Sequence, residues 1–230
     1  MNNSKNTYHP IKVILHIIAF LFLFLMEQLP LSILTLTKKQ LGSKYASYIR
    51  YAPIATIILL IIAATILIMT FKKAQKFPSQ PFTKGTWTVI IIATLLTIMI
   101  NFATLPFMKS SNENVDALKL IAGNSMIILL IFSIFVAPIL EEILFRGIFM
   151  NWFFVNSPLL SVIFSGLIFG YVHAPFSATT DWFYALSKIL LGIVLAGVYY
   201  RTKNIKADIT VHFLNNFLAI LVGALASGVI

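Results

Sequence analysis

Three short stretches of this chain place ionisable side chains inside sequence that is otherwise almost entirely apolar. The first, APILEEILFRGIFMN at residues 137–151, has two adjacent carboxylates and an arginine. On a helix, Glu142 and Arg146 lie one turn apart on the same face with the acid first, which favours an ion pair. Glu141 points about 100° away from Glu142, so its own helix supplies no partner for it. We interpret the ion pair as structural support and Glu141 as the carboxylate that performs chemistry; a purely structural polar cluster is the alternative.

The second stretch, SGLIFGYVHAP at residues 165–175, contains one histidine. His173 follows Phe169 by four residues, which puts both side chains on one helix face. Gly166 and Gly170 lie on that face too and form a G-x-x-x-G pattern, which lets another helix approach closely. We therefore place His173 on a packed face rather than against lipid. A hydrogen-bonded core histidine with no catalytic role is the alternative.

Glu141 and His173 are predicted to lie at the same depth. Residues 156–158, Asn-Ser-Pro, are typical of a turn between two helices. Glu141 precedes this turn by 15 residues and His173 follows it by 15, so each lies about 22 Å along its helix from the turn. A carboxylate and an imidazole at one depth on antiparallel helices can act as an acid/base pair.

The third stretch is DITVHFLNNF at residues 208–217. His212 and Asn216 are four residues apart and share a helix face, whereas Asn215 turns aside. Both can donate hydrogen bonds toward one point, as a developing oxyanion requires. Counted from the loop at 201–206, His212 lies only about 9–12 Å deep, which is shallower than the first two groups. Tilt or an earlier helix start must close that difference.

The elements that must position these groups are membrane-spanning helices. Of the 230 residues, 59% are hydrophobic and only 10% are charged, against about 25% charged in soluble domains. Apolar runs long enough to cross a bilayer recur along the whole chain. We predict an all-α, polytopic transmembrane helix bundle of seven helices, or eight if Pro138 divides the fourth span. The predicted spans are 11–36, 47–71, 86–108, 119–137 continuing toward 154, 158–174, 182–200 and 207–228.

The net charge of +10 comes from lysines and arginines that cluster between the spans. Such clusters are typical of loops at the lipid headgroups rather than of a nucleic-acid surface. A cytoplasmic N-terminus places the 72–84 and 201–206 loops in the cytoplasm, as the positive-inside rule favours, although the basic 38–50 loop opposes it. We expect the 151–158 turn on that same side. The chain has no cysteine, which excludes disulfides, thiolate metal sites and a cysteine nucleophile.

Other polar residues in the spans carry weaker signals. Glu27 precedes Gln28-Leu29-Pro30 and is more typical of a span end or a kink than of a catalytic acid. Asn101 and Asn124 are predicted to form hydrogen bonds between helices.

Taken together, the three stretches resemble the CPBP family, which comprises CAAX proteases and bacteriocin-processing enzymes and is also called Abi. The family pattern is E-E-x-x-x-R, F-x-x-x-H and H-x-x-x-N, each on a membrane helix. This chain matches it in order with Glu141-Glu142-Ile-Leu-Phe-Arg146, Phe169-Gly-Tyr-Val-His173 and His212-Phe-Leu-Asn-Asn216. The resemblance covers about residues 119–228. We therefore divide the chain into an N-terminal part with three spans, 1–118, and a CPBP-like catalytic helix bundle, 119–230.

What the resemblance implies is an intramembrane endopeptidase. In it Glu141 would activate a water, His173 would assist, and His212 with Asn216 would stabilise the oxyanion. Glu142 and Arg146 would support that arrangement.

Metal dependence stays open at this point. Glu141, His173 and His212 could form a two-histidine, one-carboxylate site for a metal such as zinc. The chain lacks an H-E-x-x-H helix, and the resemblance also permits a metal-free, glutamate-activated water. We favour the metal-free interpretation and assign no cofactor.

Three classes of function are compared. The leading hypothesis is a protease in the bacterial cell membrane that cleaves a peptide or small membrane-protein precursor. Its expected partners are this substrate and the lipid bilayer, and no nucleic acid. Its substrates would be leader or signal peptides, bacteriocin or pheromone precursors, or prenylated C-termini. The alternative is a bacteriocin self-immunity or regulatory membrane protein that acts by binding. A transporter with a proton relay ranks last, because it predicts paired half-helices and a repeat.

Overall fold

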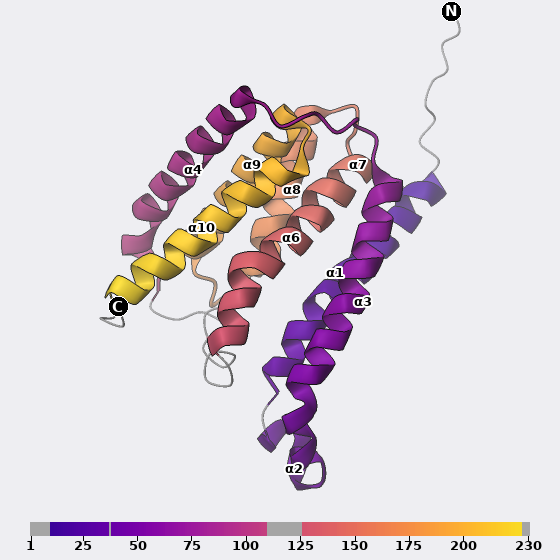
Figure 1. Cartoon of the computed structure of the whole chain (residues 1–230), viewed down its shortest axis with the longest axis vertical. Helices are drawn as coiled ribbons and strands as arrows, with labels where there is room; N and C mark the ends of the chain where they lie inside the picture. Colours follow the sequence, from indigo (N-terminus) through magenta and orange to yellow (C-terminus); the bar gives the residue numbers. More distant parts are fainter. Residues whose placement is uncertain (1–9, 37, 110–125, 227–230) are drawn as a thin grey trace, which may run out of the picture.

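The computed structural model describes residues 10–36, 38–109 and 126–226, which form a bundle of helices (Figure 1). Six helices within these ranges are long and apolar enough to cross a membrane, and the apolar helix α8 is shorter. The prediction of an all-α, multi-spanning membrane bundle is confirmed. The helices are α1 (Pro10–Leu34), α3 (Ala52–Ala74), α4 (Lys84–Thr104), a continuous helix Met126–Trp152 that contains α6, then α8 (Pro158–His173), α9 (Trp182–Thr202) and α10 (Ile205–Ala226).

Pro138 does not divide the fourth span. The described residues therefore form seven apolar helices rather than eight: six that are long enough to cross a membrane, and the shorter α8. The expected start of the fourth span, at residues 119–125, lies outside the described residues. The helix is wound wide, as a π-helix, in η3 (Phe132–Val136) just before α6 (Ala137–Glu142). Proline has no N–H and clashes with the carbonyl four residues earlier. A wide turn at this place relieves that conflict without ending the helix.

A second wide turn, η4 (Ile143–Phe149), follows directly and leads into α7 (Met150–Trp152). Carbonyl groups of this turn are bound by side chains from other segments. Gln75 Nε2 and Asn151 Nδ2 each donate to the Gly147 carbonyl at 3.0 Å, and Ser165 Oγ donates to the Phe145 carbonyl at 3.3 Å. Sequence periodicity alone predicts a regular helix here and does not show the partners that other helices supply, Gln75 and Ser165.

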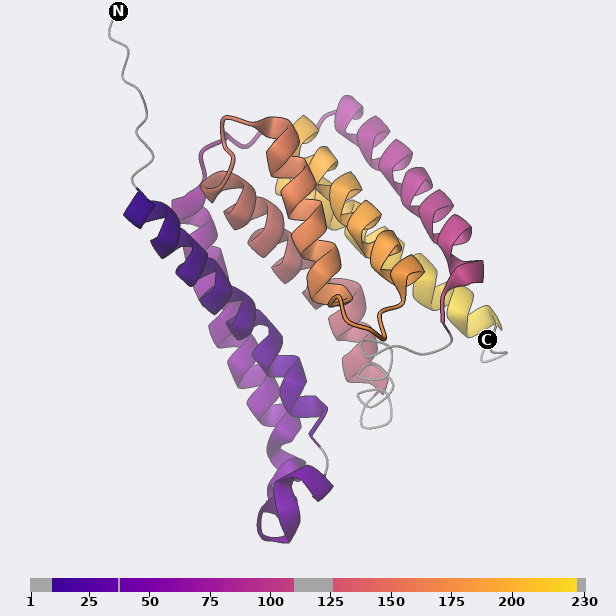
Figure 2. The same ribbon diagram turned by 180° about the vertical axis from the view of Figure 1, so that it is seen from behind.

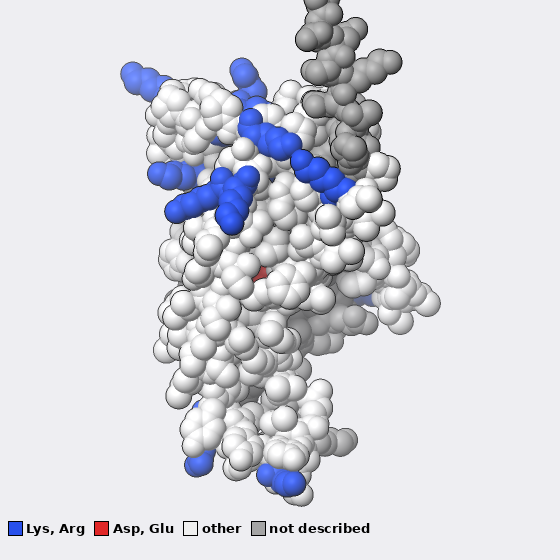
Figure 3. All heavy atoms as spheres, turned by 90° about the vertical axis from the view of Figure 1, so that its right-hand side faces the viewer, with Lys and Arg blue, Asp and Glu red and all other residues white. Residues whose placement is uncertain are grey.

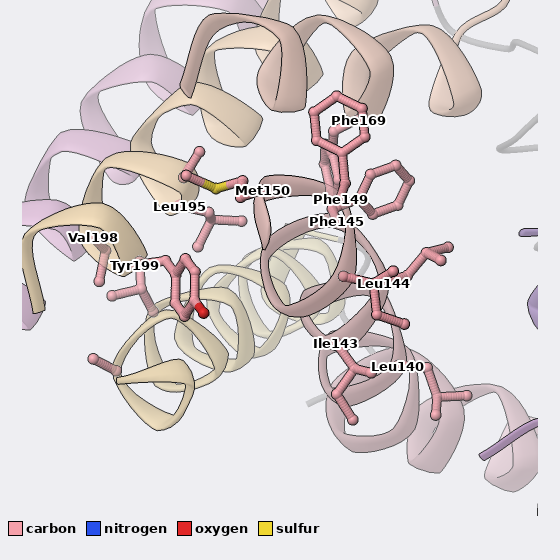
Figure 4. Close-up of a cluster of buried hydrophobic side chains, with 14 of the residues drawn as sticks. Leu140, Ile143, Leu144, Phe145, Phe149, Met150, Phe169, Leu195, Val198 and Tyr199 are labelled. Carbon is pink, nitrogen blue, oxygen red and sulfur yellow. The ribbon is translucent and has the colours of Figure 1, made fainter. Parts of the chain in front are cut away.

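The helix Met126–Trp152 lies at the centre of the bundle. α1 and α3 pack together on one side of it, and α4, α8, α9 and α10 lie on the other (Figures 1 and 2). Its residues 142–151 are all buried, which is typical of a helix surrounded by protein. Figure 4 shows Phe145, Phe149 and Phe169 gathered on one side of this helix, and the rings of Phe145 and Phe169 have centroids 5.3 Å apart.

α8 and α9 approach each other closely along the predicted G-x-x-x-G face. A Cβ atom on Gly170 would lie 2.8 Å from the backbone of Ile189, and one on Gly166 would lie 2.7 Å from the backbone nitrogen of Ile193. Because glycine has only a hydrogen atom as its side chain, the two helices can come into contact at these positions. The prediction that His173 lies on a packed helix face is confirmed.

The connections after α3, α7 and α9 lie at one end of the bundle (Figure 1). The Lys76 backbone N–H donates to Asn151 Oδ1 at 2.8 Å, and the Gln80 backbone N–H donates to the Lys203 carbonyl at 3.2 Å. The 151–158 turn and the 201–206 loop are thus on the same side, as expected. Figure 3 shows basic side chains concentrated at this end, fewer at the opposite end, and acidic atoms visible only near the middle of that face.

Candidate active site

Three side chains named from the sequence converge in the middle of the bundle. Glu141 Oε2 lies 3.7 Å from His173 Nε2 and 3.8 Å from His212 Nε2. The Glu141 side chain is 12% exposed, His173 20% and His212 3%, and the Glu141 Oε2 atom is itself buried. The prediction that Glu141 and His173 lie level with each other across the α7–α8 turn is confirmed, and His212 lies beside them.

The other ring nitrogen of each histidine is already bound. His173 Nδ1 lies 2.8 Å from the Phe169 carbonyl oxygen, and His212 Nδ1 lies 2.7 Å from Glu142 Oε1. Carbonyl and carboxylate oxygens only accept hydrogen bonds, so each Nδ1 carries the hydrogen. In the neutral form of either ring, Nε2 then has a lone pair directed toward Glu141.

Glu142 and Arg146 form the ion pair predicted from their spacing. Arg146 Nη1 donates to Glu142 Oε1 at 3.0 Å, and both side chains are fully buried. Arg146 Nη2 also donates to the Gly192 carbonyl at 2.8 Å. The same Glu142 oxygen accepts from His212 Nδ1, so one carboxylate ties the central helix to α10 and fixes the His212 ring.

Asn216 is held by a chain of amide hydrogen bonds. Asn101 Nδ2 donates to Asn215 Oδ1 at 2.9 Å, and Asn215 Nδ2 donates to Asn216 Oδ1 at 3.1 Å. Asn216 Nδ2 donates to the Ser133 carbonyl at 2.9 Å, which leaves its second N–H for another acceptor. The interhelical role predicted for Asn101 is confirmed, whereas Asn124 lies outside the described residues. Asn215 is part of this chain, a role that helix-face geometry did not suggest.

The depth of His212 agrees with that of Glu141 although counting from the loop predicted a shallower position. Residues at the start of α10 are already buried: Asn204 is 6% exposed and Ala207 0%. Asn204 Nδ2 donates to the Gln80 carbonyl at 2.7 Å. The segment between α3 and α4 therefore covers the turn before α10, although Lys206 in the first turn of that helix is exposed.

Asp208 was missed in the sequence. Its side chain is fully buried, and neither carboxyl oxygen has a hydrogen-bond donor among the described residues. It lies near the Glu142 carboxyl group, which pairs with Arg146. The signal was its spacing: Asp208 precedes His212 by four residues and so lies on the same face of α10 as that histidine.

Glu27 was interpreted as marking a span end or a kink, and α1 does not end there but continues through Pro30 to Leu34. The carboxyl group is 2% exposed and accepts a hydrogen bond from Gln28 Nε2 at 2.6 Å. The end of a membrane span therefore does not explain the presence of Glu27 at this position.

The residues proposed as metal ligands do not assemble into a metal site here. Within the described part of the chain, no three His, Cys, Asp or Glu side chains are arranged to hold a metal ion. We therefore derive no reaction step through a metal, and the open alternative of the sequence, with Glu141, His173 and His212 as ligands, is not carried further.

A family model described as "Type II CAAX prenyl endopeptidase Rce1-like" matches residues 123–218 of this chain. The resemblance to the CPBP family is confirmed. The CPBP-like segment contains all three motifs and covers less than half of the chain, within the part 119–230. The division of the chain at residue 118 stays a prediction.

A bacterial relative extends the likeness along the chain. UPF0177 protein YvdC of Lactococcus lactis subsp. lactis (strain IL1403) is 24% identical over 217 residues, which is 90% of this chain and 78% of that protein. No solved structure matches the chain. At the level of the family, the chain is thus an integral membrane protein related to CAAX-type peptidases.

Proposed function

We propose that this protein is an intramembrane endopeptidase in which Glu141 activates a water molecule for attack on a peptide bond. The observation that carries the proposal is the convergence of Glu141 Oε2 on the Nε2 atoms of His173 and His212 at 3.7 and 3.8 Å. These separations are too long for direct hydrogen bonds. They suit one water molecule that contacts all three groups. The match to a peptidase family supports this chemistry.

In the proposed reaction, the water donates one hydrogen bond to Glu141 and the other to His173 Nε2. Glu141 takes the first proton as the water oxygen forms a bond to the carbonyl carbon of the substrate. The carbonyl oxygen becomes an oxyanion. Glu141 then passes the proton to the leaving nitrogen as the carbon–nitrogen bond breaks, which gives a carboxylic acid and an amine.

The oxyanion is assigned to Asn216 and His212. Asn216 can donate its second amide hydrogen, because its first is held by Ser133. His212 can donate from Nε2 only while its ring carries both hydrogens, because Nδ1–H is bound to Glu142. Glu142 accepts from His212 Nδ1–H and so fixes the orientation of the ring, and Arg146 in turn holds Glu142 in place.

The substrate in this proposal is a peptide or a small membrane-associated precursor. The proposed substrate classes are leader or signal peptides, bacteriocin or pheromone precursors, and prenylated C-termini. The site lies in a bundle of membrane helices, so we propose that the scissile bond enters from the bilayer. The bacterial relative supports a location in the bacterial cell membrane.

The test is Glu141→Gln in cells, with peptides of the medium and the membrane compared by mass spectrometry. Glutamine keeps the shape of the side chain and cannot take the proton, so we expect cleavage to fall about 10²–10⁴-fold, the usual contribution of a general base. His173→Gln should lower cleavage as well. His16→Gln is the matched control, because His16 stacks on Trp152 with ring centroids 4.5 Å apart, away from the site.

Protein abundance is measured for each variant, so that loss of protein is not read as loss of catalysis. Disappearance of specific peptides with Glu141→Gln, and not with His16→Gln, supports the endopeptidase and identifies its products. If the peptides and the cellular phenotype are both unchanged, the protein does not act by cleavage. In that case the immunity or regulatory binding function replaces the endopeptidase as the proposed function.

A further inference from the structure

Three asparagine side chains form a chain of hydrogen bonds that runs from α4 to the central helix. α10 packs against α4 on one side and against the central helix on the other (Figure 1). Asn101 Nδ2 of α4 donates to Asn215 Oδ1, and Asn215 Nδ2 donates to Asn216 Oδ1. Asn216 Nδ2 then donates to the Ser133 carbonyl of the central helix. Asn101 lies outside the segment 123–218 that the family model matches, so the chain links a residue of the N-terminal part to Asn216.

The Ser133 carbonyl gives this chain of amides a fixed direction. A carbonyl oxygen only accepts hydrogen bonds, so the Asn216 amide must present its nitrogen to Ser133 and its oxygen to Asn215. Asn215 must in turn present its nitrogen to Asn216 and its oxygen to Asn101. Turning any one of these amides over would place two oxygens against each other. The orientations of the three side chains are therefore set together.

Pro138 makes the Ser133 carbonyl available as an acceptor. In the wide turn η3, the Ala137 N–H donates to the Phe132 carbonyl five residues earlier. The next bond of this pattern would join the N–H of residue 138 to the Ser133 carbonyl, but proline has no N–H. Asn216 Nδ2 donates to that carbonyl instead, at 2.9 Å. The proline inside the fourth span thus provides an acceptor for a side chain of α10.

We propose that Asn101 is a positioning residue for the oxyanion: through Asn215, it keeps the second N–H of Asn216 directed at the reacting carbonyl group. This inference rests on the proposed endopeptidase. Asn215 and Ser133 hold the oxygen and the first N–H of the Asn216 amide, which leaves the second N–H to donate. An amide turned over would direct an oxygen lone pair to the same place and would repel the oxyanion.

The test separates positioning of Asn216 from support of the fold. Full-length protein in liposomes is given a pool of short apolar synthetic peptides, and the peptide that the wild type cleaves fastest is used alone to measure kcat and KM. Asn101→Leu removes the first donor of the chain, so that Asn215 and Asn216 can turn over. We expect kcat to fall about tenfold, less than the roughly 10²–10³-fold for outright loss of an oxyanion donor, as in Asn216→Leu. KM should change little, because the bond to the oxyanion forms only in the transition state.

Thr94→Val is the matched control for Asn101→Leu. Thr94 lies two helical turns before Asn101 in α4, and its buried hydroxyl has no hydrogen-bond partner among the described residues. This change from polar to apolar should therefore leave kcat at the wild-type value. Asn101→Leu is also combined with Asn216→Leu, where it should lower kcat no further, because Asn101 acts only through the Asn216 amide.

Equal kcat values for Asn101→Leu and Thr94→Val overturn the role of Asn101, and so does a further fall in kcat when Asn216→Leu is already present. In both cases cleavage by the wild type leaves the endopeptidase standing. Unfolding temperatures test the chain of amides without cleavage: Asn101→Leu should destabilise the wild type more than it destabilises the Asn216→Leu protein. If that difference is found and the wild type cleaves no peptide of the pool, the endopeptidase and the catalytic role of Asn101 are both contradicted, and the chain of amides stands as a support of the fold.

Discussion

At the scale of single residues, Glu141 and Glu142 are neighbours in sequence with opposite surroundings. Glu142 Oε1 accepts from both Arg146 and His212, and the side chain is fully buried. Glu141 Oε2 has no hydrogen-bond donor among the described residues and is directed at two histidine nitrogens. Because consecutive residues on a helix differ by about 100° in direction, one carboxylate braces the bundle and the other remains available for chemistry.

Replacing Arg146 by methionine should destabilise the fold strongly. The change leaves the buried Glu142 charge without its cation, and breaking a buried ion pair on one side costs about 3–5 kcal/mol. Thermal unfolding in detergent measures it. Arg201→Met is the control: Arg201 is exposed at the end of α9, and its loss should change stability by about 0.5 kcal/mol or less. Equal unfolding temperatures for the two variants would show that the pair does not support the fold.

Asp208→Asn should stabilise the protein by about 1 kcal/mol. Glu142 Oε2 and both Asp208 oxygens lack donors, and an asparagine amide can donate to Glu142, a gain typical of one hydrogen bond. Asp181→Asn is the contrasting control. The Asp181 oxygens accept from the Lys109 and Tyr184 backbone N–H groups at 2.7 and 3.1 Å, so its amide should be less stable than wild type. A large loss of stability with Asp208→Asn would mean that Asp208 itself donates a hydrogen bond to Glu142.

At the scale of elements, the crossing of α8 and α9 decides where His173 lies. Glycine at 166 and 170 lets the two backbones touch, and His173 follows Gly170 by less than one helical turn. A change in the separation of these helices therefore moves the imidazole relative to Glu141, which is on a third helix.

Gly170→Ala should lower the rate of peptide cleavage by a larger factor than its loss of folding stability alone would cause. The added methyl group meets the backbone of Ile189, so the helices must separate, at a cost of about 1–3 kcal/mol typical of overpacking. Gly197→Ala in α9 is the matched control: a Cβ atom there meets nothing within 4 Å, and alanine favours a helix over glycine by about 1 kcal/mol. Unfolding temperature and rate of peptide release are measured for both. Full activity of Gly170→Ala would show that the helix separation does not position His173.

At the scale of the whole molecule, the ends of the bundle differ in charge. The end with the 151–158 turn carries Lys72, Lys73, Lys76, Lys84, Arg201, Lys203 and Lys206. At this end the Lys203 ammonium lies 3.7 Å from the centre of the Tyr200 ring, and burial lowers the pKa of Lys203. Basic loops favour the cytoplasmic side.

We expect a cysteine at Ser79 to face the cytoplasm and one at Ser43 to face the outside. Both residues are exposed, Ser79 between α3 and α4 and Ser43 in α2 (Lys38–Tyr45) at the opposite end of the bundle (Figure 1). The natural chain has no cysteine, so each variant has a single site. A membrane-impermeant maleimide should label Ser43→Cys in intact cells and Ser79→Cys only after permeabilisation. The reverse pattern would invert the orientation, and equal labelling of both in intact cells would contradict a membrane-spanning bundle.

The sequence by itself determined the fold class, the spans and the three motif faces. Those features depend on hydrophobicity and helical periodicity, which are local properties of the chain. The Glu142–Arg146 pair and the level of Glu141 with His173 could be predicted for the same reason, since each involves one helix or one hairpin.

Only the tertiary structure decided what depends on contacts between distant segments. The position of His212 level with Glu141 follows from the packing of α10 against the central helix. The wide turn at 143–149 is supported by Gln75 and Ser165 from other helices. Asp208 comes near Glu142 through the packing of α10 against the central helix. Side-chain partners from other helices set these features, and a one-dimensional pattern of polar and apolar residues does not contain that information.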